Sequence, residues 1–218
     1  MYGNPKEKIA SRAAREITQG MVVNLGIGIP TLIPNYLSDG LPLTMHSENG
    51  IIGAGEIAER GHEDRNLIDA GGSYITTVPG AAFCDSALSF ALVRGGRLDL
   101  TFLGALEISE AGDLANWIIP GKFAPGIGGA MELAQKARRL VITTTHTTRN
   151  GSPKLLKNCT LPLTAPACVD LIITELAVIS IRAGQGMVLE EIAAETTLEA
   201  VQAATEAELI IPDEVKTF

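Results

Sequence analysis

The sequence predicts a single α/β domain over residues 1–218, an open, mostly parallel sheet flanked by helices on both faces, with an antiparallel edge. Short apolar runs alternate with amphipathic segments along the chain, as in repeated strand–helix units. Hydrophobic residues make up 46% of the chain and aromatic residues 4%, so we expect a core of Ala, Val, Ile and Leu, which suits strands buried on both faces. A chain of 218 residues can bury one sizeable core, which leaves little room for a second full domain.

The N-terminal elements follow from apolar spacing and glycine stops. Residues 5–18 are expected to be helical, because their apolar side chains fall on one face and Gly20 follows as a stop. A strand is expected at 21–25, followed by the turn Gly26-Ile27-Gly28 and a helix opened by Pro30 or Thr31.

The next strand, 43–46, leads into the stretch "MHSENGIIGAG", which is expected to end as a glycine-rich turn. Further β-like runs are 66–70 and 74–78. The segment "SALSFALVR" is expected to be a helix, capped by Asp85 and ended by Gly95, with a strand at 98–103 after it.

The second half repeats these signals. The remaining expected elements are a hairpin around Ala111-Gly112, a helix at 128–139, a strand at 141–144, two short strands within 171–181, a turn at 183–186 into a strand at 187–190, and a helix at 197–205. In sheets of this kind ligands bind outside the carboxyl ends of the strands, where the glycine-rich turns after Leu25 and His46 are expected.

Composition excludes several classes of partner. The formal net charge is -8 and no run of Lys or Arg stands out, so a nucleic-acid partner is not expected. The three cysteines are odd in number and widely spaced, which argues against a disulfide framework and favours a reducing, cytoplasmic location. The N-terminus lacks the apolar core of a signal peptide, and no apolar run reaches the roughly 18 residues of a membrane span.

The common cofactor and metal motifs are incomplete here. "GIGIPT" resembles the start of a dinucleotide fingerprint, but Thr31 stands where the third glycine should be. That turn is either a tight strand-to-helix connection or a place where backbone amides approach a phosphate or pantetheine-like ligand. His46, His62 and His146 lack metal-ligand spacing, and no G-x-S-x-G is present, so no metal is expected.

Glu48 is the most informative residue, because it stands at the break between a strand and glycines. It can simply cap the turn at Asn49-Gly50, a common turn pair. However, it is flanked by hydrogen-bonding Ser47 and Asn49, and the glycines that follow allow another backbone or a ligand to approach closely. A glutamate with an ordinary pKa of about 4.3 is ionised at neutral pH and can attack an activated acyl group such as a thioester.

These residues carry a resemblance to a known family. "HSENGIIG" resembles the glutamate signature of family I CoA transferases, and specifically of the beta subunit of 3-oxoacid CoA transferases. The resemblance covers nearly the whole chain, through "VNLGIGIPT", "SFALVRGG", "LGALEIS", "DLANWIIPGK", "GGAMEL" and "CTLPLT". Met45 replaces the usual Leu or Phe, which is a mild change.

The resemblance implies a Rossmann-like CoA transferase fold, coenzyme A as a substrate with no resident cofactor, and, as the partner, an alpha subunit in a heterodimer or heterotetramer. Glu48 matches the nucleophile that forms a glutamyl-CoA thioester, and Gly129 matches a glycine whose amide holds the oxyanion. The residues expected to line the substrate and CoA cleft are Asn24, Gly26, Gly28, Ser47, Asn49, Gly50, Gly53, Gly55 and Gly128.

One departure from the family bears on the substrate. Members specialised for succinyl-CoA often carry Lys after an Asn-Ala-Gly, whereas this chain reads Asp69-Ala70-Gly71-Gly72. The chain therefore resembles the acetate/butyrate–acetoacetate type more than the succinyl type. Three alternatives stay open: an acyl-CoA hydrolase that uses the same glutamate, a non-catalytic CoA-binding subunit, and a sugar-phosphate isomerase of related topology.

Overall fold

The structure is a computed structural model that describes residues 4–122 and 124–218. Its helices are α1 (Pro5–Ala14), the 3-10 helix η1 (Ile29–Tyr36), α2 (Ser86–Arg94), α3 (Ala130–Lys136) and α4 (Leu198–Ala203). Its strands are β1 (Val22–Leu25), β2 (Thr44–Ser47), β3 (Ile51–Ile57), β4 (Ile75–Phe83), β5 (Leu100–Leu103), β6 (Glu107–Ser109), β7 (Leu114–Ala115), β8 (Leu140–Thr143), β9 (Leu155–Leu156), β10 (Leu171–Ile173), β11 (Ala177–Arg182), β12 (Gly186–Ile192), β13 (Leu209–Ile210) and β14 (Lys216–Thr217).

An 11-stranded sheet runs in the order β13-β12-β11-β10-β8-β5-β1-β2-β3-β4, with β14 beside β12. Its centre, from β10 through β8, β5 and β1 to β2, is parallel throughout. The pairs β2–β3 and β3–β4 on one side and β10–β11 and β11–β12 on the other are antiparallel. The predicted α/β class is confirmed, but antiparallel strands flank the parallel centre on both sides, rather than at one edge.

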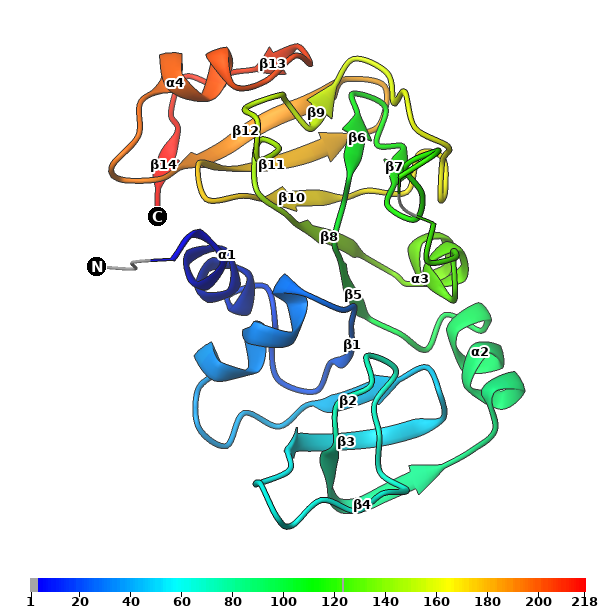
Figure 1. The fold of residues 1–218 in the computed structure, drawn as a ribbon. Coiled ribbons are helices and arrows are strands. Elements are labelled where there is room, and N and C mark those ends of the chain that lie inside the picture. The colour runs from blue at the N-terminus through cyan, green and yellow to red at the C-terminus, as the bar shows by residue number, and fades with distance from the viewer. Residues whose placement is uncertain (1–3, 123) are drawn as a thin grey trace.

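Helices cover both faces of this sheet (Figure 1), as predicted. Along β5, Leu100 and Phe102 join the apolar cluster of α1 and η1, while Leu103 joins the cluster on the opposite face. That opposite face is covered by α3, α4 and the small sheet β7-β6-β9, and α2 packs against α3 beside it. Successive side chains of a strand point to opposite faces of the sheet. Because both faces are covered, the sequences of these short strands are apolar throughout.

Two parts of the sequence prediction are wrong. Residues 51–57 form strand β3, although their glycines predicted a turn, because Gly53 and Gly55 lie against β4 where side chains would collide. Residues 66–70 are not a strand, and the segment makes a single bridge between Ile68 and Tyr74. The other predicted elements are present, several of them shorter than expected: the first helix ends at Ala14, and the segment after Gly28 is a 3-10 helix that contains Pro34.

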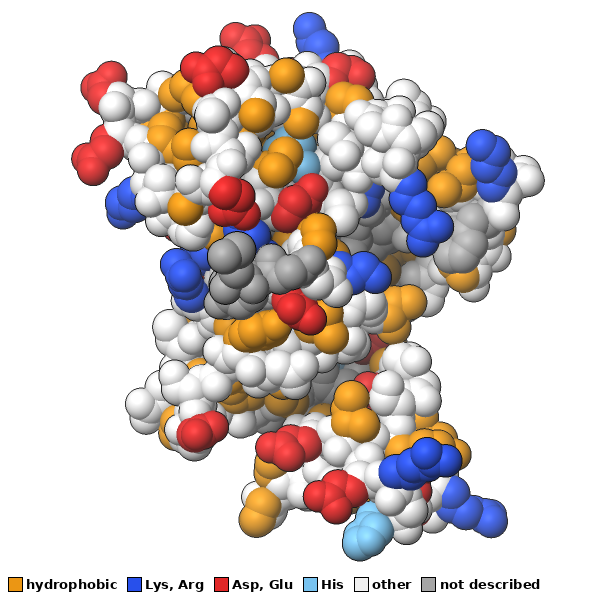
Figure 2. All heavy atoms as spheres, turned by 60° about the vertical axis from the view of Figure 1, so that its left-hand side comes forward, with side chains coloured by type: hydrophobic (Ala, Val, Ile, Leu, Met, Phe, Trp, Pro, Cys, Tyr) orange, Lys and Arg blue, Asp and Glu red, His pale blue; other side chains and the backbone are white. Residues whose placement is uncertain are grey.

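The surface is of mixed charge. On the face drawn in Figure 2, acidic and basic side chains are interspersed. Among the described residues, no helix combines the length and apolar character that crossing a bilayer requires.

Candidate active site

Glu48 lies at the tip of the tight turn that joins β2 to β3, at the carboxyl end of β2. The Gly50 N–H donates to the Ser47 carbonyl at 3.0 Å and closes the turn. Gly50 has a φ of +117°, and a Cβ there would lie 1.9 Å from the Cys84 carbonyl oxygen. Only glycine fits this position, so the turn that presents Glu48 is fixed by its neighbours.

Asn24 holds the Glu48 carboxylate from the neighbouring parallel strand. Register pairs Asn24 of β1 with His46 of β2, which brings the turns after Leu25 and Ser47 to one edge of the sheet, at the carboxyl ends of their strands. The Asn24 Nδ2 donates to Glu48 Oε2 at 2.9 Å and to the His46 carbonyl at 3.1 Å. Both amide hydrogens are therefore used, and the orientation of the amide is determined.

His46 is buried beneath Glu48 and contacts α2. Its Nε2 lies 2.9 Å from Ser89 Oγ, and its Nδ1 lies 3.5 Å from Asn24 Nδ2. Burial lowers the pKa of His46, and the nearby Glu48 charge opposes that shift only in part. Burial therefore favours the neutral imidazole.

Gly129 lies directly beside Glu48. It precedes α3 as the N-cap residue, and a Cβ built on it would lie 3.7 Å from Glu48 Cγ and 2.4 Å from Phe90 Cζ. Its φ of -81° suits any residue, so glycine is required here because there is no room for a Cβ and not because of the backbone conformation. Within the described residues the Gly129 N–H makes no hydrogen bond, and such helix-start amides are suited to a developing negative charge.

The other predicted site residues fall into two groups. Ser47 and Asn49 bind the neighbouring loop: the Ala70 N–H donates to Ser47 Oγ at 2.9 Å, and Asn49 Nδ2 donates to the Ile68 carbonyl at 2.6 Å. Gly26, Gly50, Gly53 and Gly55 allow close packing within the chain, whereas Gly28 and Gly128 face open space. Their part in CoA binding stays a prediction.

The cysteines are free and partly buried. Burial raises the pKa of Cys159 and of Cys168 to about 12, so these two thiols stay protonated and are poor nucleophiles. A hollow of about 320 Å³ lies around Lys136 and Arg138, at the amino ends of β8 and β10. It opens on the opposite edge of the sheet from Glu48.

Sequence reasoning misses three residues of this region. In the sequence, His46 is a candidate only for a metal ligand, and Ser89 and Phe90 are only parts of a helix. A signal for Ser89 exists, since it is a polar residue on the buried side of a mostly apolar helix. Phe90 carries no comparable signal, because its contact with Gly129 depends on the packing of α2 on α3.

Comparison with known proteins identifies the class. Residues 6–204 match the family described as Coenzyme A transferase, and the chain belongs to that family, whose members are enzymes. Within it, the chain corresponds to the beta chain of the enzyme. It is 52% identical over 206 residues to the beta subunit of a probable coenzyme A transferase from Bacillus subtilis, with 94% of each chain covered. It is 46% identical over 212 residues to the beta subunit of the acetate CoA-transferase from Escherichia coli K12, covering 97% of this chain and 96% of that one.

A third relative carries a different substrate name. It belongs to a probable succinyl-CoA:3-ketoacid coenzyme A transferase from Bacillus subtilis and is 46% identical over 210 residues, covering 96% of this chain and 97% of that one.

Solved structures share the fold at low sequence identity. The acyl-CoA transferase YdiF of E. coli O157:H7 aligns with a TM-score of 0.79 and 23% identity, over 99% of this chain and 43% of that one. A variant of the decarboxylase AibA/AibB aligns with a TM-score of 0.72 and 23% identity, over 98% of this chain and 88% of that one. Since one fold serves a transferase and a decarboxylase, the reaction has to be argued from the site.

Proposed function

We propose that this chain is the catalytic beta subunit of a CoA transferase, which moves CoA from an acyl-CoA to a 3-oxoacid or short-chain carboxylic acid through a glutamyl-CoA thioester on Glu48. The observation that carries the proposal is the arrangement around Glu48. Its carboxylate accepts from Asn24 at 2.9 Å, and Gly129 lies beside it with an N–H that no described residue binds.

The reaction starts from the ionised carboxylate. A Glu48 oxygen attacks the thioester carbonyl, the tetrahedral oxyanion collapses, and the CoA thiolate leaves, which gives a mixed anhydride. The thiolate then attacks the glutamyl carbonyl and releases the first acid as its carboxylate. The incoming carboxylate attacks the glutamyl-CoA thioester, and the same steps in reverse return the thiolate to the new acyl group. CoA is a substrate throughout, and no resident cofactor is required.

Each chain residue has a separate task in this scheme. Asn24 orients one carboxylate oxygen of Glu48 and leaves the other to attack. The Gly129 N–H donates to the oxyanion, a contribution that typically lowers the barrier by about 3–4 kcal/mol. Asn24, Gly26, Gly28, Ser47, Asn49, Gly50, Gly53, Gly55 and Gly128 are proposed to line the cleft around them.

The substrate proposal rests on the loop at 69–72. Its Ala70 amide binds Ser47, next to Glu48, and Gly71 packs close to Ile27. A residue of this loop is therefore well placed to contact the acyl group. Because it lacks the Lys that marks succinyl-specific members, we propose acetate, butyrate or acetoacetate as the acids.

The partner proposed is an alpha subunit, in a heterodimer or heterotetramer located in the cytoplasm, with neither nucleic acid nor membrane as a binding partner. The relatives at 46–52% identity are named as beta subunits, which supports a second chain.

Co-expression with an alpha chain tests the function. The complex should transfer CoA only when an acceptor acid is present, and Glu48→Gln should abolish rapid transfer, while Glu59→Gln, at an exposed glutamate, should not. CoA release that needs no acceptor would favour the hydrolase instead. Full activity of Glu48→Gln would favour a non-catalytic subunit.

A further inference from the structure

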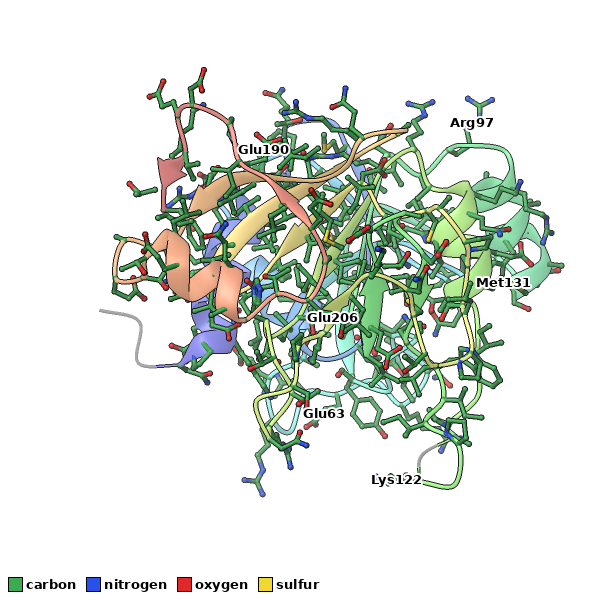
Figure 3. All side chains as sticks on the ribbon, turned by 90° about the horizontal axis from the view of Figure 1, so that it is seen from above. Glu63, Arg97, Lys122, Met131, Glu190 and Glu206 are labelled. Carbon is green, nitrogen blue, oxygen red and sulfur yellow. The ribbon has the colours of Figure 1, made fainter. Side chains whose placement is uncertain are left out.

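Helix α2 reaches both sides of Glu48 with two consecutive residues. Ser89 contacts His46, which lies beneath Glu48, and Phe90 contacts Gly129, which lies beside it. Figure 1 shows α2 next to α3 at one side of the sheet, and the two helices pack against each other. In Figure 3, Arg97 and Met131 mark this side of the molecule.

The Ser89 contact determines the state of His46. Ser89 is 0% exposed and His46 5% exposed, so neither exchanges its partner for water. Nδ1 of His46 faces the NH₂ group of Asn24, whose two hydrogens go to Glu48 and the His46 carbonyl, so a proton on Nδ1 would point at another donor. The tautomer with the proton on Nε2, which donates to Ser89 Oγ, avoids this clash. Ser89 thereby holds the imidazole in the tautomer that tolerates the Asn24 amide, and that amide donates to Glu48.

The Phe90 contact determines the position of Gly129. The ring packs so closely on Gly129 that a Cβ there would lie 2.4 Å from Cζ. The same face of Gly129 looks toward Glu48, with 3.7 Å between the built Cβ and Glu48 Cγ. A smaller side chain at position 90 would leave a void against Gly129, so packing would no longer fix the position of Gly129 relative to Glu48.

The base of α2 is itself tied to the Glu48 turn. The Cys84 N–H donates to the Gly50 carbonyl at 2.9 Å, and Asp85 caps the helix by accepting from the Leu88 N–H at 2.8 Å. At the other end, Val93 packs with Leu98 and Leu133 in one buried cluster. The helix is therefore fixed at both ends.

We infer that Ser89 and Phe90 are positioning residues for the transfer reaction, and that α2 sets the separation between the Glu48 carboxylate and the Gly129 N–H. The inference rests on the proposed function, because it requires Glu48 as nucleophile. A displacement of about 1 Å at a reacting group can reduce a rate by about a hundredfold, so the loss of either contact has a measurable effect.

Single-turnover formation of the Glu48–CoA adduct, in the complex with the alpha subunit, tests this inference. Ser89→Ala and Phe90→Leu are compared with Ser86→Ala, which removes the same hydroxyl from an exposed position of α2. We expect Ser89→Ala and Phe90→Leu to slow adduct formation by about tenfold to a hundredfold. The final amount of adduct per chain and the KM for acyl-CoA should match the wild type, as should all properties of Ser86→Ala.

The outcomes separate the inference from the proposed function. An adduct at the wild-type rate in Ser89→Ala overturns the inference and leaves the function standing. A reduced final amount at an unchanged rate constant also overturns it, because that result reports lost folded protein. The absence of any adduct in the wild type overturns the function itself. Should Phe90→Leu not fold, Ser89→Ala, which deletes one atom, decides alone.

Discussion

At the scale of single residues, the Glu48 carboxylate depends on a neutral donor. Asn24 is 0% exposed, and its Oδ1 has no partner among the described residues. The hydrogen bonds of this side chain therefore come from its Nδ2 group, which donates to Glu48. An unpaired buried oxygen is costly, and its retention beside Glu48 fits a functional role for this asparagine.

The substitution Asn24→Asp tests that role. It keeps the size of the side chain but puts a second carboxylate at hydrogen-bond distance from Glu48, and two such groups cannot both ionise freely. We expect kcat to fall by about a hundredfold or more at neutral pH, the size of effect seen for a misplaced reacting group. Steady-state kinetics on the complex measure it, with Asn150→Asp, at an exposed position, as control. Unchanged kcat in folded Asn24→Asp would show that this donor is dispensable.

At the scale of elements, the sequence predicted most strands and helices because their signals are local. Asp85 and Gly95 delimit α2 as expected, through a side-chain cap and a glycine end. Strand β3 was not predicted because its glycines are required by a contact that is distant in sequence. They face β4 at distances that leave no room for a Cβ. Likewise the apolar run 66–70 makes only a single bridge, from Ile68 to Tyr74, and other backbone groups of this run bind the Ser47 and Asn49 side chains.

His146, which follows β8, contacts Thr174 after β10 and Thr205 after α4. Its burial leads us to expect that the stability of the protein depends on pH. His146 Nε2 lies 2.8 Å from Thr205 Oγ1, and Nδ1 lies 2.9 Å from Thr174 Oγ1. The residue is 0% exposed, and burial lowers its pKa from 6.5 to about 4. Between pH 6.5 and pH 4 the unfolded chain binds more protons at His146 than the folded chain does. The free energy of unfolding is therefore not reduced by His146 above pH 6.5, and it falls as the pH drops toward 4.

We expect His146→Gln to show a shallower loss of unfolding free energy than the wild type over this pH window. The difference in slope should approach one proton, or about 1.4 kcal/mol per pH unit. Urea denaturation at pH 7, 6 and 5 measures it. Equal slopes in the two proteins would mean that His146 does not titrate on unfolding, whatever the effect of the substitution at pH 7.

At the scale of the whole molecule, the first helix and the last strands are joined by buried charges. Arg12 of α1 binds Glu191 of β12 through two hydrogen bonds of 2.8 and 2.7 Å, and binds Glu16 at 2.6 Å. Lys8 lies over the ring of Phe218 at 5.3 Å from its centroid. Figure 1 shows α1 beside β14, so residues from opposite ends of the sequence meet at one place.

We therefore expect Arg12→Ala to lower the free energy of unfolding by up to about 3–5 kcal/mol, because it leaves half-buried Glu191 without this partner and Glu16 with Arg139 alone. The exposed pair Arg94–Glu132 is the control, and Arg94→Ala should cost about 0–1 kcal/mol. Denaturant titration compares the two. A similar small loss for both would contradict the view that Arg12 joins the two ends of the chain.

This long-range pairing marks the limit of the sequence prediction. Apolar spacing placed the strands along the chain, but the order β8-β5-β1-β2 brings together segments that are far apart in sequence. The same holds for the site. The Glu48 motif and the glycine at 129 were predicted one by one, whereas their contact, through Phe90, depends on how α2 and α3 pack.

The central claim is that Glu48 carries the CoA during transfer, and one measurement tests it most directly. The complex with the alpha subunit is incubated with acyl-CoA and no acceptor acid, then digested and mapped by mass spectrometry. The account predicts CoA attached to the peptide that contains Ser47-Glu48-Asn49, through a thioester that borohydride reduces, and no adduct in Glu48→Gln. An adduct on Cys84 or on another carboxylate would contradict the account.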